Sequence, residues 1–302
     1  MKNISIALDW TANTNHTGFY VADRLGFFKN RGLSISIITP DIDNYAITSA
    51  KKLETGQVDF ALCPLESIIS YRTKATPFEA IAVAALLTQD ISKIVCLDRD
   101  DIKTPKDLSG KTYASYKARY EDQMVKEMIA NDGGEPTLTI VYPEKPGIWN
   151  TLLTGKADAT WIFDNWEGVE ARQKGIALNG FFMDDYNVPY GYSPVLATSK
   201  QLLHEKNTGY KHFIEATKEG FVFAANNPVE AVKILQPHVP RQSNELAFLI
   251  QSQLYTNNFM GNETDWGMMD DKVVKKFVDW IYERHLETIP VNWHSLFTNQ
   301  LL

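Results

Sequence analysis

A polar and aromatic segment follows the first predicted strand of the chain. Asp9 and Trp10 open this segment, and His16 lies near its end. An indole ring offers a flat face for stacking, and a carboxylate accepts hydrogen bonds from an amino group. The segment could therefore hold a planar, nitrogen-rich ring. His16 either reaches such a ligand or caps the helix that follows, and the residue types leave both roles open.

Aromatic and acidic side chains also follow four later strands or crossovers. Glu66 comes after the strand at 60–63, where its alternative role is to stabilise the start of a helix through the helix dipole. The other candidate ligand-binding residues are Tyr116, Tyr120 and Glu121 after the strand near 113, Trp161, Phe163, Trp166 and Glu170 after the strand near 159, and Tyr190 at a crossover. They do not recur at the spacing of a buried helix or strand face, so we expect them to bind a neutral or cationic heteroaromatic molecule.

Enzyme signatures are scarce in the sequence. It contains no Gly-rich phosphate loop and no Gly-x-Ser-x-Gly motif, and its six histidines do not stand at metal-ligand spacing. We therefore predict no catalytic residue, no metal and no cofactor. Cys63 and Cys96 lie in apolar runs, and we expect both to be buried free thiols.

Strands and helices alternate along most of the chain, which predicts an α/β fold with mostly parallel sheets. The predicted strands are 4–8, 33–38, 60–63, 81–87 and 138–141, and the predicted helices are 18–25, 45–54, 66–72, 120–132, 149–153, 209–226, 229–235, 245–255 and 272–284. The string 53–61 resembles the string 153–160, with a Gly and then an Asp before a strand. We interpret this repeat as the same βαβ step in two similar lobes.

A length of 302 residues suits two lobes better than one core. We expect one lobe at 1–89 plus 196–302, a second at 90–195, and a ligand cleft between them. The net charge of −7 gives no basic surface for nucleic acid, and no apolar run is long enough for a transmembrane segment. The start of the sequence does not resemble a signal peptide, so we expect a cytoplasmic protein if the numbering is full length, and a periplasmic or lipid-anchored one if a leader was removed.

Several motifs together resemble one known family. The segment Leu8–Ala22, the segment Gly26–Leu33 and the segment Trp161–Ala171 are similar to the thiamine-pyrimidine family, which contains formyl-aminopyrimidine-binding proteins and fungal thiamine pyrimidine synthases. The resemblance implies a type II periplasmic-binding-protein fold and a 4-aminopyrimidine ligand. It places Asp9, Trp10, Glu66, Trp166 and Glu170 on cleft motifs, and Tyr116, Tyr120 and Glu121 more loosely.

The sequence departs from the synthases of this family at their reactive segments. Those enzymes use a histidine, a lysine that holds pyridoxal phosphate, and a cysteine-rich run. The matching segment Cys63–Ile68 has neither lysine nor histidine, and the segment Val188–Ser193 has no cysteine. We therefore expect non-enzymatic binding, with an ABC permease as partner if the protein is exported.

Two alternatives to pyrimidine binding remain. One is an enzyme of thiamine or pyrimidine metabolism that uses a carboxylate as acid or base. The other is a sulfonate- or taurine-type solute binder, for which Lys117 and Arg119 are the obvious cations in the candidate segments.

Overall fold

The computed structural model describes residues 1–302 and divides the chain into two compact units. The first unit comprises Met1–Asp90, Gly191–Lys275 and Ile289–Leu302, and the second comprises Ile91–Tyr190 and Lys276–Thr288. The chain thus passes from one unit to the other four times.

The first unit is built on a five-stranded sheet with the order β2-β1-β3-β10-β4. Its strands are β1 (Lys2–Ala7), β2 (Leu33–Ile38), β3 (Phe60–Cys63), β4 (Ala80–Ala85) and β10 (Val195–Ser199). β1 pairs in parallel with β2 and β3, whereas β10 runs antiparallel to both of its neighbours. Parallel strands buried on both faces favour apolar runs, and every residue of β3, β4 and β10 is buried.

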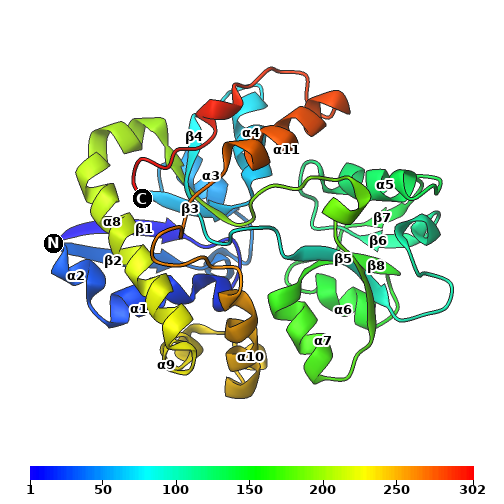
Figure 1. Cartoon of the computed structure of the whole chain (residues 1–302), viewed down its shortest axis with the longest axis horizontal. Helices are drawn as coiled ribbons and strands as arrows, with labels where there is room; N and C mark the ends of the chain where they lie inside the picture. The colour runs from blue at the N-terminus through cyan, green and yellow to red at the C-terminus, as the bar shows by residue number, and fades with distance from the viewer. The chain divides into compact units, whose positions relative to one another are not determined.

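The first unit also contains seven helices, and α8 packs against α1 and α2 (Figure 1). They are α1 (Thr17–Arg24), α2 (Phe27–Asn30), α3 (Ser49–Glu54), α4 (Leu65–Thr73), α8 (Lys200–Asn226), α9 (Pro228–Leu235) and α10 (Leu246–Asn257). The packing is aromatic: the ring of Phe213 stacks on those of Phe28 and Phe60, with centroid distances of 5.4 and 4.6 Å. The helix α8 thus folds back onto the elements of the first sheet.

The helices α1 and α8 approach each other at two glycines. A Cβ atom built on Gly220 would lie 2.1 Å from the carbonyl oxygen of Gly18, and one built on Gly18 would lie 2.1 Å from the ring of Phe221. A larger side chain at Gly220 would force the helices apart, and one at Gly18 would displace the Phe221 ring. α1 directly follows the segment of Asp9 and His16, so this crossing helps to fix that segment.

The second unit repeats the strand order of the first. Its sheet has the order β7-β6-β8-β5-β9. Its strands are β5 (Ser92–Leu97), β6 (Thr112–Ala114), β7 (Thr139–Val141), β8 (Ala159–Phe163) and β9 (Leu178–Phe181), and its helices are α5 (Glu121–Asn131), α6 (Ile148–Leu153) and α7 (Val169–Gln173). β5 takes the antiparallel place that β10 takes in the first sheet.

The Gly-to-Asp repeat occupies equivalent places in the two sheets. Gly56 ends α3 before β3, and Gly155 ends α6 before β8, with φ values of +71° and +68°. Glycine adopts this left-handed conformation without steric cost, so it suits the turn that ends a helix. β3 and β8 each pair in parallel with the first strand of their own βαβ run, which confirms the predicted repeat.

The aspartate of each repeat fastens its strand to that neighbour. The Asp59 carboxylate accepts the backbone N–H of Ser5 at 2.9 Å, and the Asp158 carboxylate accepts that of Thr112 at 2.9 Å. A cation binds the other oxygen of each carboxylate at 2.7 Å: Lys206 for Asp59 and Arg99 for Asp158. The two copies of the repeat therefore share a hydrogen bond to the neighbouring strand and an ion pair, as well as the same turn.

The boundary between the units falls within α11 (Asp271–Glu283). The sequence-based division assigns residues 276–288 to the first lobe, whereas in the structure they belong to the second unit. There the ring of Phe277 lies 5.5 Å from that of Tyr190, and Arg284 donates to Glu127 at 2.7 Å. Helical periodicity identifies a buried face but not the partner of that face, which accounts for the difference.

Short turns complete the structure. The 3-10 turns are Thr14–His16, Pro40–Asp43, Pro105–Leu108, Asp184–Tyr186, Gln236–His238, Arg241–Ser243 and Trp293–Ser295, and a π-helical turn spans Asp164–Gly168. None of the helices is long and apolar enough to cross a bilayer. Both cysteines are buried and free, as predicted.

Candidate functional site

Asp9 and His16 form a hydrogen-bonded pair in the loop that follows β1. The two side chains meet at 2.9 Å between His16 Nε2 and Asp9 Oδ1. His16 is fully buried, whereas Asp9 keeps about a quarter of its side chain exposed (24%). The backbone N–H of Asn13 donates to the other ring nitrogen, Nδ1, at 3.2 Å. The buried imidazole thus connects the loop backbone to a carboxylate that reaches the surface of the unit.

The loop itself is anchored to α10. The Thr14 hydroxyl lies 2.7 Å from that of Ser252, and the Thr17 hydroxyl donates to Gln253 at 2.6 Å. All four side chains are buried. Buried polar groups are costly unless they are paired, so these bonds hold the loop in one conformation.

Trp10 packs beside an aromatic residue that sequence reasoning missed. Its ring lies 5.2 Å from the ring of Tyr45 at an angle of 55°. Tyr45 and the preceding Asn44 both have positive φ values, 61° and 52°, in a loop where a helix is predicted. Left-handed backbone is uncommon for an aromatic residue and concentrates at functional sites. The sequence signal for this loop is the run of turn-forming residues at 40–44, directly before the predicted helix.

Glu66 is buried in the first turn of α4, directly after β3. Burial, followed by the charges of Asp9 and Glu66, raises the pKa of the Cys63 thiol. Both carboxylates therefore lie near the end of β3, which pairs with β1. The first unit thus brings Asp9, Trp10, His16 and Glu66 to the carboxyl ends of two neighbouring strands.

In the second unit, Glu121 organises the loop after β6. Its carboxylate accepts the Tyr113 hydroxyl at 2.8 Å and the backbone N–H groups of Tyr116 and Ala118 at 3.0 and 3.1 Å. Burial raises the pKa of this carboxyl, although the backbone bonds oppose the shift. Glu121 thus shapes the loop that presents Tyr116.

Tyr120 lies in the interior of the second unit. Its side chain is buried, and its hydroxyl donates to Glu287 at 3.2 Å. The same carboxylate accepts Arg119 at 2.6 Å. These bonds tie the loop after β6 to the segment 276–288.

The rings of Trp161 and Tyr190 meet edge to face at 5.0 Å. Trp161 is the third residue of β8, not a residue that follows the strand as predicted, and it is 7% exposed. The ring of Tyr190 also lies 5.5 Å from that of Phe277. Two predicted site residues far apart in the sequence therefore lie side by side, and their contact joins the middle of β8 to the segment of Tyr190.

A π-helical turn, Asp164–Gly168, follows β8 and carries Trp166. Asp164 is held by Lys93 at 2.7 Å and by Arg172 at 3.1 Å, and a Cβ on Gly168 would collide with its carboxylate. Single π-helical turns are rare and concentrate at functional sites. The turn leaves Trp166 half-buried.

Glu167 in that turn was not predicted as a site residue. It accepts the backbone N–H of Phe163 at 3.1 Å, and burial raises its pKa to about 7. A carboxyl with a perturbed pKa beside half-buried aromatic residues is a functional candidate. Glu170, the predicted carboxylate, lies in α7 and pairs instead with Lys174.

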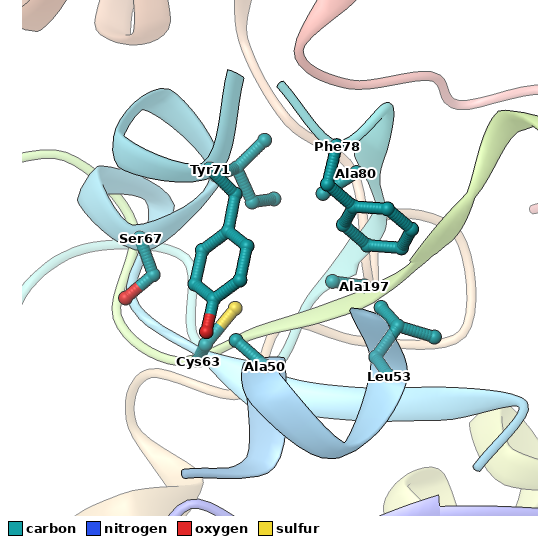
Figure 2. Close-up of a pocket in the computed structure, with 9 residues that line it drawn as sticks. Ala50, Leu53, Cys63, Ser67, Tyr71, Phe78, Ala80 and Ala197 are labelled. Carbon is teal, nitrogen blue, oxygen red and sulfur yellow. The ribbon is translucent and has the colours of Figure 1, made fainter. Parts of the chain in front are cut away.

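A small apolar pocket lies elsewhere in the first unit, between β3, α3 and α4. Figure 2 shows the rings of Tyr71 and Phe78 facing it, together with the Cys63 thiol. Its lining residues include no charged side chain: they are Ala50, Leu53, Cys63, Ser67, Ile68, Tyr71, Phe78, Ala80 and Ala197. Its polar side-chain groups are the hydroxyls of Ser67 and Tyr71 and the Cys63 thiol, so it offers no carboxylate to a polar ring.

Comparison with known proteins identifies the family. The model of the NMT1/THI5-like family matches residues 13–231, which is more than half of the chain. The chain belongs to the NMT1/THI5-like family. The matched range includes the loop of His16 and the π-helical turn of Trp166, as the resemblance of those motifs predicts.

Relatives with different named functions are similar in sequence to the chain. It is 25% identical to the formylaminopyrimidine-binding protein of Halalkalibacterium halodurans, over 78% of this chain and 70% of that protein. It is 26% identical to a putative thiamine biosynthesis protein of Haemophilus influenzae, over 80% and 76%. It is 23% identical to the 4-amino-5-hydroxymethyl-2-methylpyrimidine phosphate synthase THI12 of Saccharomyces cerevisiae, over 99% and 87%.

Solved structures establish the fold of this family member. A Candida albicans protein with the generic periplasmic-binding-protein fold superposes with a TM-score of 0.74 at 15% identity, over 99% of this chain and 97% of that one. The alkanesulfonate-binding protein of Xanthomonas axonopodis superposes with a TM-score of 0.73 at 13% identity, over 99% and 98%. The chain therefore has the predicted periplasmic-binding-protein fold.

Proposed function

We propose that this protein binds a small heteroaromatic molecule of the 4-aminopyrimidine type and releases it unchanged. The main support is the group of side chains at the carboxyl end of β1. Asp9, which is oriented by His16, is adjacent in sequence to Trp10, and the Trp10 ring packs beside that of Tyr45. An indole can stack on a pyrimidine ring, and an ionised carboxylate can accept its amino hydrogens. The similarity to a formylaminopyrimidine-binding protein supports this ligand class.

The second unit offers side chains of the same kind. Tyr116, Trp161, Trp166 and Tyr190 supply rings, and Glu167 supplies a carboxyl. We propose that these residues serve ligand binding in the second unit, as Asp9, Trp10, His16 and Glu66 do in the first. Phe163, Tyr120, Glu121 and Glu170 support the same loops and complete the proposed set.

The test is a thermal-shift and calorimetric titration with formyl-aminopyrimidine, hydroxymethylpyrimidine, thiamine and taurine. A ligand at one hundred times its Kd should stabilise the protein by about 2.7 kcal/mol, which raises Tm by several degrees. Trp10→Ala should weaken pyrimidine binding by about tenfold or more, because stacking of a base on an aromatic ring contributes about 1–3 kcal/mol. Absence of binding to both aminopyrimidines would refute the proposal.

Trp293→Ala is the matched control. Trp293 belongs to the same unit and stacks on His294, in a turn whose Ser295 accepts a hydrogen bond from Arg72. Arg72 lies near the end of α4, six residues and about 9 Å of helix away from Glu66. This variant should therefore bind pyrimidines with the affinity of the wild type.

An enzymatic role is the second candidate. Glu167 has a pKa of about 7, which suits a general acid or base, and the synthases of the family align over almost the whole chain. Mass spectrometry of the pyrimidine after incubation distinguishes the two roles. An unchanged ligand supports binding alone, whereas a product that disappears in Glu167→Gln supports catalysis.

A sulfonate ligand is less well supported by the charges of the site. It would need cations, and Arg119 of the candidate loop already pairs with the buried Glu287 at 2.6 Å. Taurine should therefore produce no thermal shift.

An import role would add an ABC permease as partner, because structural neighbours include a ligand-binding component of an ABC-type import system. Fractionation of cells that express the full-length natural gene, followed by affinity purification, tests this partner and the compartment.

A further inference from the structure

The buried His16 performs two tasks with its two ring nitrogens. Nδ1 lies 3.2 Å from the backbone nitrogen of Asn13, whose hydrogen it must accept. A backbone N–H can only donate, so Nδ1 carries a lone pair. The ring proton then belongs to Nε2, which donates to Asp9 Oδ1 at 2.9 Å. The geometry therefore selects one tautomer of a neutral ring.

The hydrogen bond from Nε2 orients the Asp9 carboxylate. A neutral imidazole does this without cancelling the charge of a carboxylate, whereas an imidazolium would cancel it. An ionised carboxylate accepts at both oxygens and donates at neither, and Asp9 is the partner that reaches the surface of the unit. Glu66 adds a second carboxyl near the end of the neighbouring strand. The hydrogen bond from His16 thus holds the Asp9 acceptor in one orientation at this edge of the sheet.

The surroundings of His16 keep this arrangement in place. The Asn13 side chain accepts the backbone N–H of Asn15 at 2.9 Å and donates to the Thr11 carbonyl at 3.1 Å. Together with the bonds from Thr14 and Thr17 to α10, these contacts fix the backbone on which the imidazole rests. The position of the ring is therefore determined before any ligand arrives.

We propose that His16 is a positioning residue that aims the Asp9 carboxylate at an amino or ring N–H group of the ligand and thereby selects ligands with a hydrogen-bond donor. This inference rests on the proposed function for its ligand class. A site built to bond a donor discriminates strongly against an analogue that lacks it, because the carboxylate is then left without its partner. His16 itself does not contact the ligand.

Two conservative variants separate the roles of the ring nitrogens. His16→Asn places its amide near Nδ1, so it can still accept from Asn13 but cannot reach Asp9. His16→Gln places its amide near Nε2, so it can still donate to Asp9 but loses the bond to Asn13. The readout is the ratio of the Kd of a des-amino pyrimidine to the Kd of the 4-aminopyrimidine, measured by calorimetry.

The wild type should prefer the amino ligand by about tenfold or more. His16→Asn should reduce this preference to about that of Asp9→Asn, while His16→Gln should keep most of it even if its Tm falls. A purely structural role would instead weaken both ligands equally in both variants and leave the ratio unchanged. That result would overturn the proposal.

Nitrogen-15 NMR of ligand-free protein with labelled histidine tests the geometry independently. At neutral pH, His16 should show a protonated Nε2 and an unprotonated Nδ1, with the signals assigned by their loss in His16→Gln. An imidazolium or the opposite tautomer would overturn the proposal. If the wild type binds neither pyrimidine, the proposed function fails, and the NMR spectrum still decides whether His16 orients Asp9.

Discussion

The crossing of α1 and α8 at Gly18 and Gly220 leads to the most direct prediction. In Gly220→Ala, the new methyl group would lie 2.1 Å from the Gly18 carbonyl oxygen and 2.9 Å from the Ala22 Cβ. Van der Waals contact needs about 3.5 Å, so the helices must separate locally by about 1.4 Å if only the backbone moves. A gap of about 0.5–1 Å already forfeits a quarter to a half of the dispersion energy of the contacts it opens.

The magnitude follows from two opposing effects. Overpacking of a buried contact costs about 1–3 kcal/mol, and the backbone position of this contact places it at the upper end. Alanine has a better helix propensity than glycine by about 1 kcal/mol, which offsets part of that cost. We therefore expect Gly220→Ala to lower the free energy of unfolding by about 2 kcal/mol.

Gly209→Ala is the matched control, because it makes the same chemical change in the same helix. Its new Cβ would meet only the flexible end of Lys2, at 3.0 Å. The propensity gain then dominates, and this variant should be more stable than the wild type by about 0.5–1 kcal/mol.

Urea unfolding followed by circular dichroism measures both changes, and the corresponding Tm shifts are about 2–4 °C per kcal/mol. The reasoning is refuted if Gly220→Ala is as stable as the wild type, or if both alanines change stability in the same direction.

Three further predictions concern buried or part-buried ionisable groups. The pKa of Glu167 rises from 4.5 to about 7 on folding, so in this pH range the folded state binds more protons than the unfolded state. The free energy of unfolding should therefore fall as the pH rises from about 5 to 7. Urea titrations at a series of pH values should show this fall, and Glu167→Gln should remove most of it. The Cys63 thiol should resist a colorimetric thiol reagent in the native protein, because burial raises its pKa and blocks access of the reagent. It should react at once in about 6 M guanidinium, which unfolds the protein. Reaction of Cys63 in the folded protein would contradict the structure. Asp59→Ala and Asp158→Ala should each destabilise their own unit by about 1–2 kcal/mol. Each change removes the acceptor of a backbone N–H and one partner of a part-exposed ion pair that solvent screens. Calorimetry should show the loss, and a change below about 0.5 kcal/mol would contradict the proposed fastening role.

Local patterns in the sequence predicted most of the elements. The strands at 33–38 and 60–63 were predicted with the observed bounds, because Gly32, Gly56 and Pro64 interrupt the flanking chain on either side of clear apolar patterns. The helix predicted at 45–54 begins only at Ser49, after the Thr48 cap, because Asn44 and Tyr45 take a left-handed conformation. Such backbone geometry depends on tertiary contacts, here the packing of Tyr45 on Trp10, and not on local propensity.

The candidate site was harder to predict than the fold. Residue types located the loops of Asp9 and Tyr116 and the turn of Trp166, because these segments concentrate aromatic and acidic side chains. They did not show that His16 is buried or that Trp161 meets Tyr190, since both facts depend on chain segments that come together only on folding. The same reason explains why Glu167 was overlooked within a motif whose other members were chosen.

The insertion of β10 between β3 and β4 determines the order in which the two sheets can form during synthesis. All strands of the second sheet lie within residues 92–181, so that sheet can close as soon as this segment leaves the ribosome. The first sheet begins earlier but cannot close until residue 199 has been made, and meanwhile β3 and β4 each lack their partner on one edge. Unpaired strand edges promote aggregation. The part of the protein that is made first is therefore the part that is completed last, and the nascent chain should depend most on chaperones while its second unit is already folding.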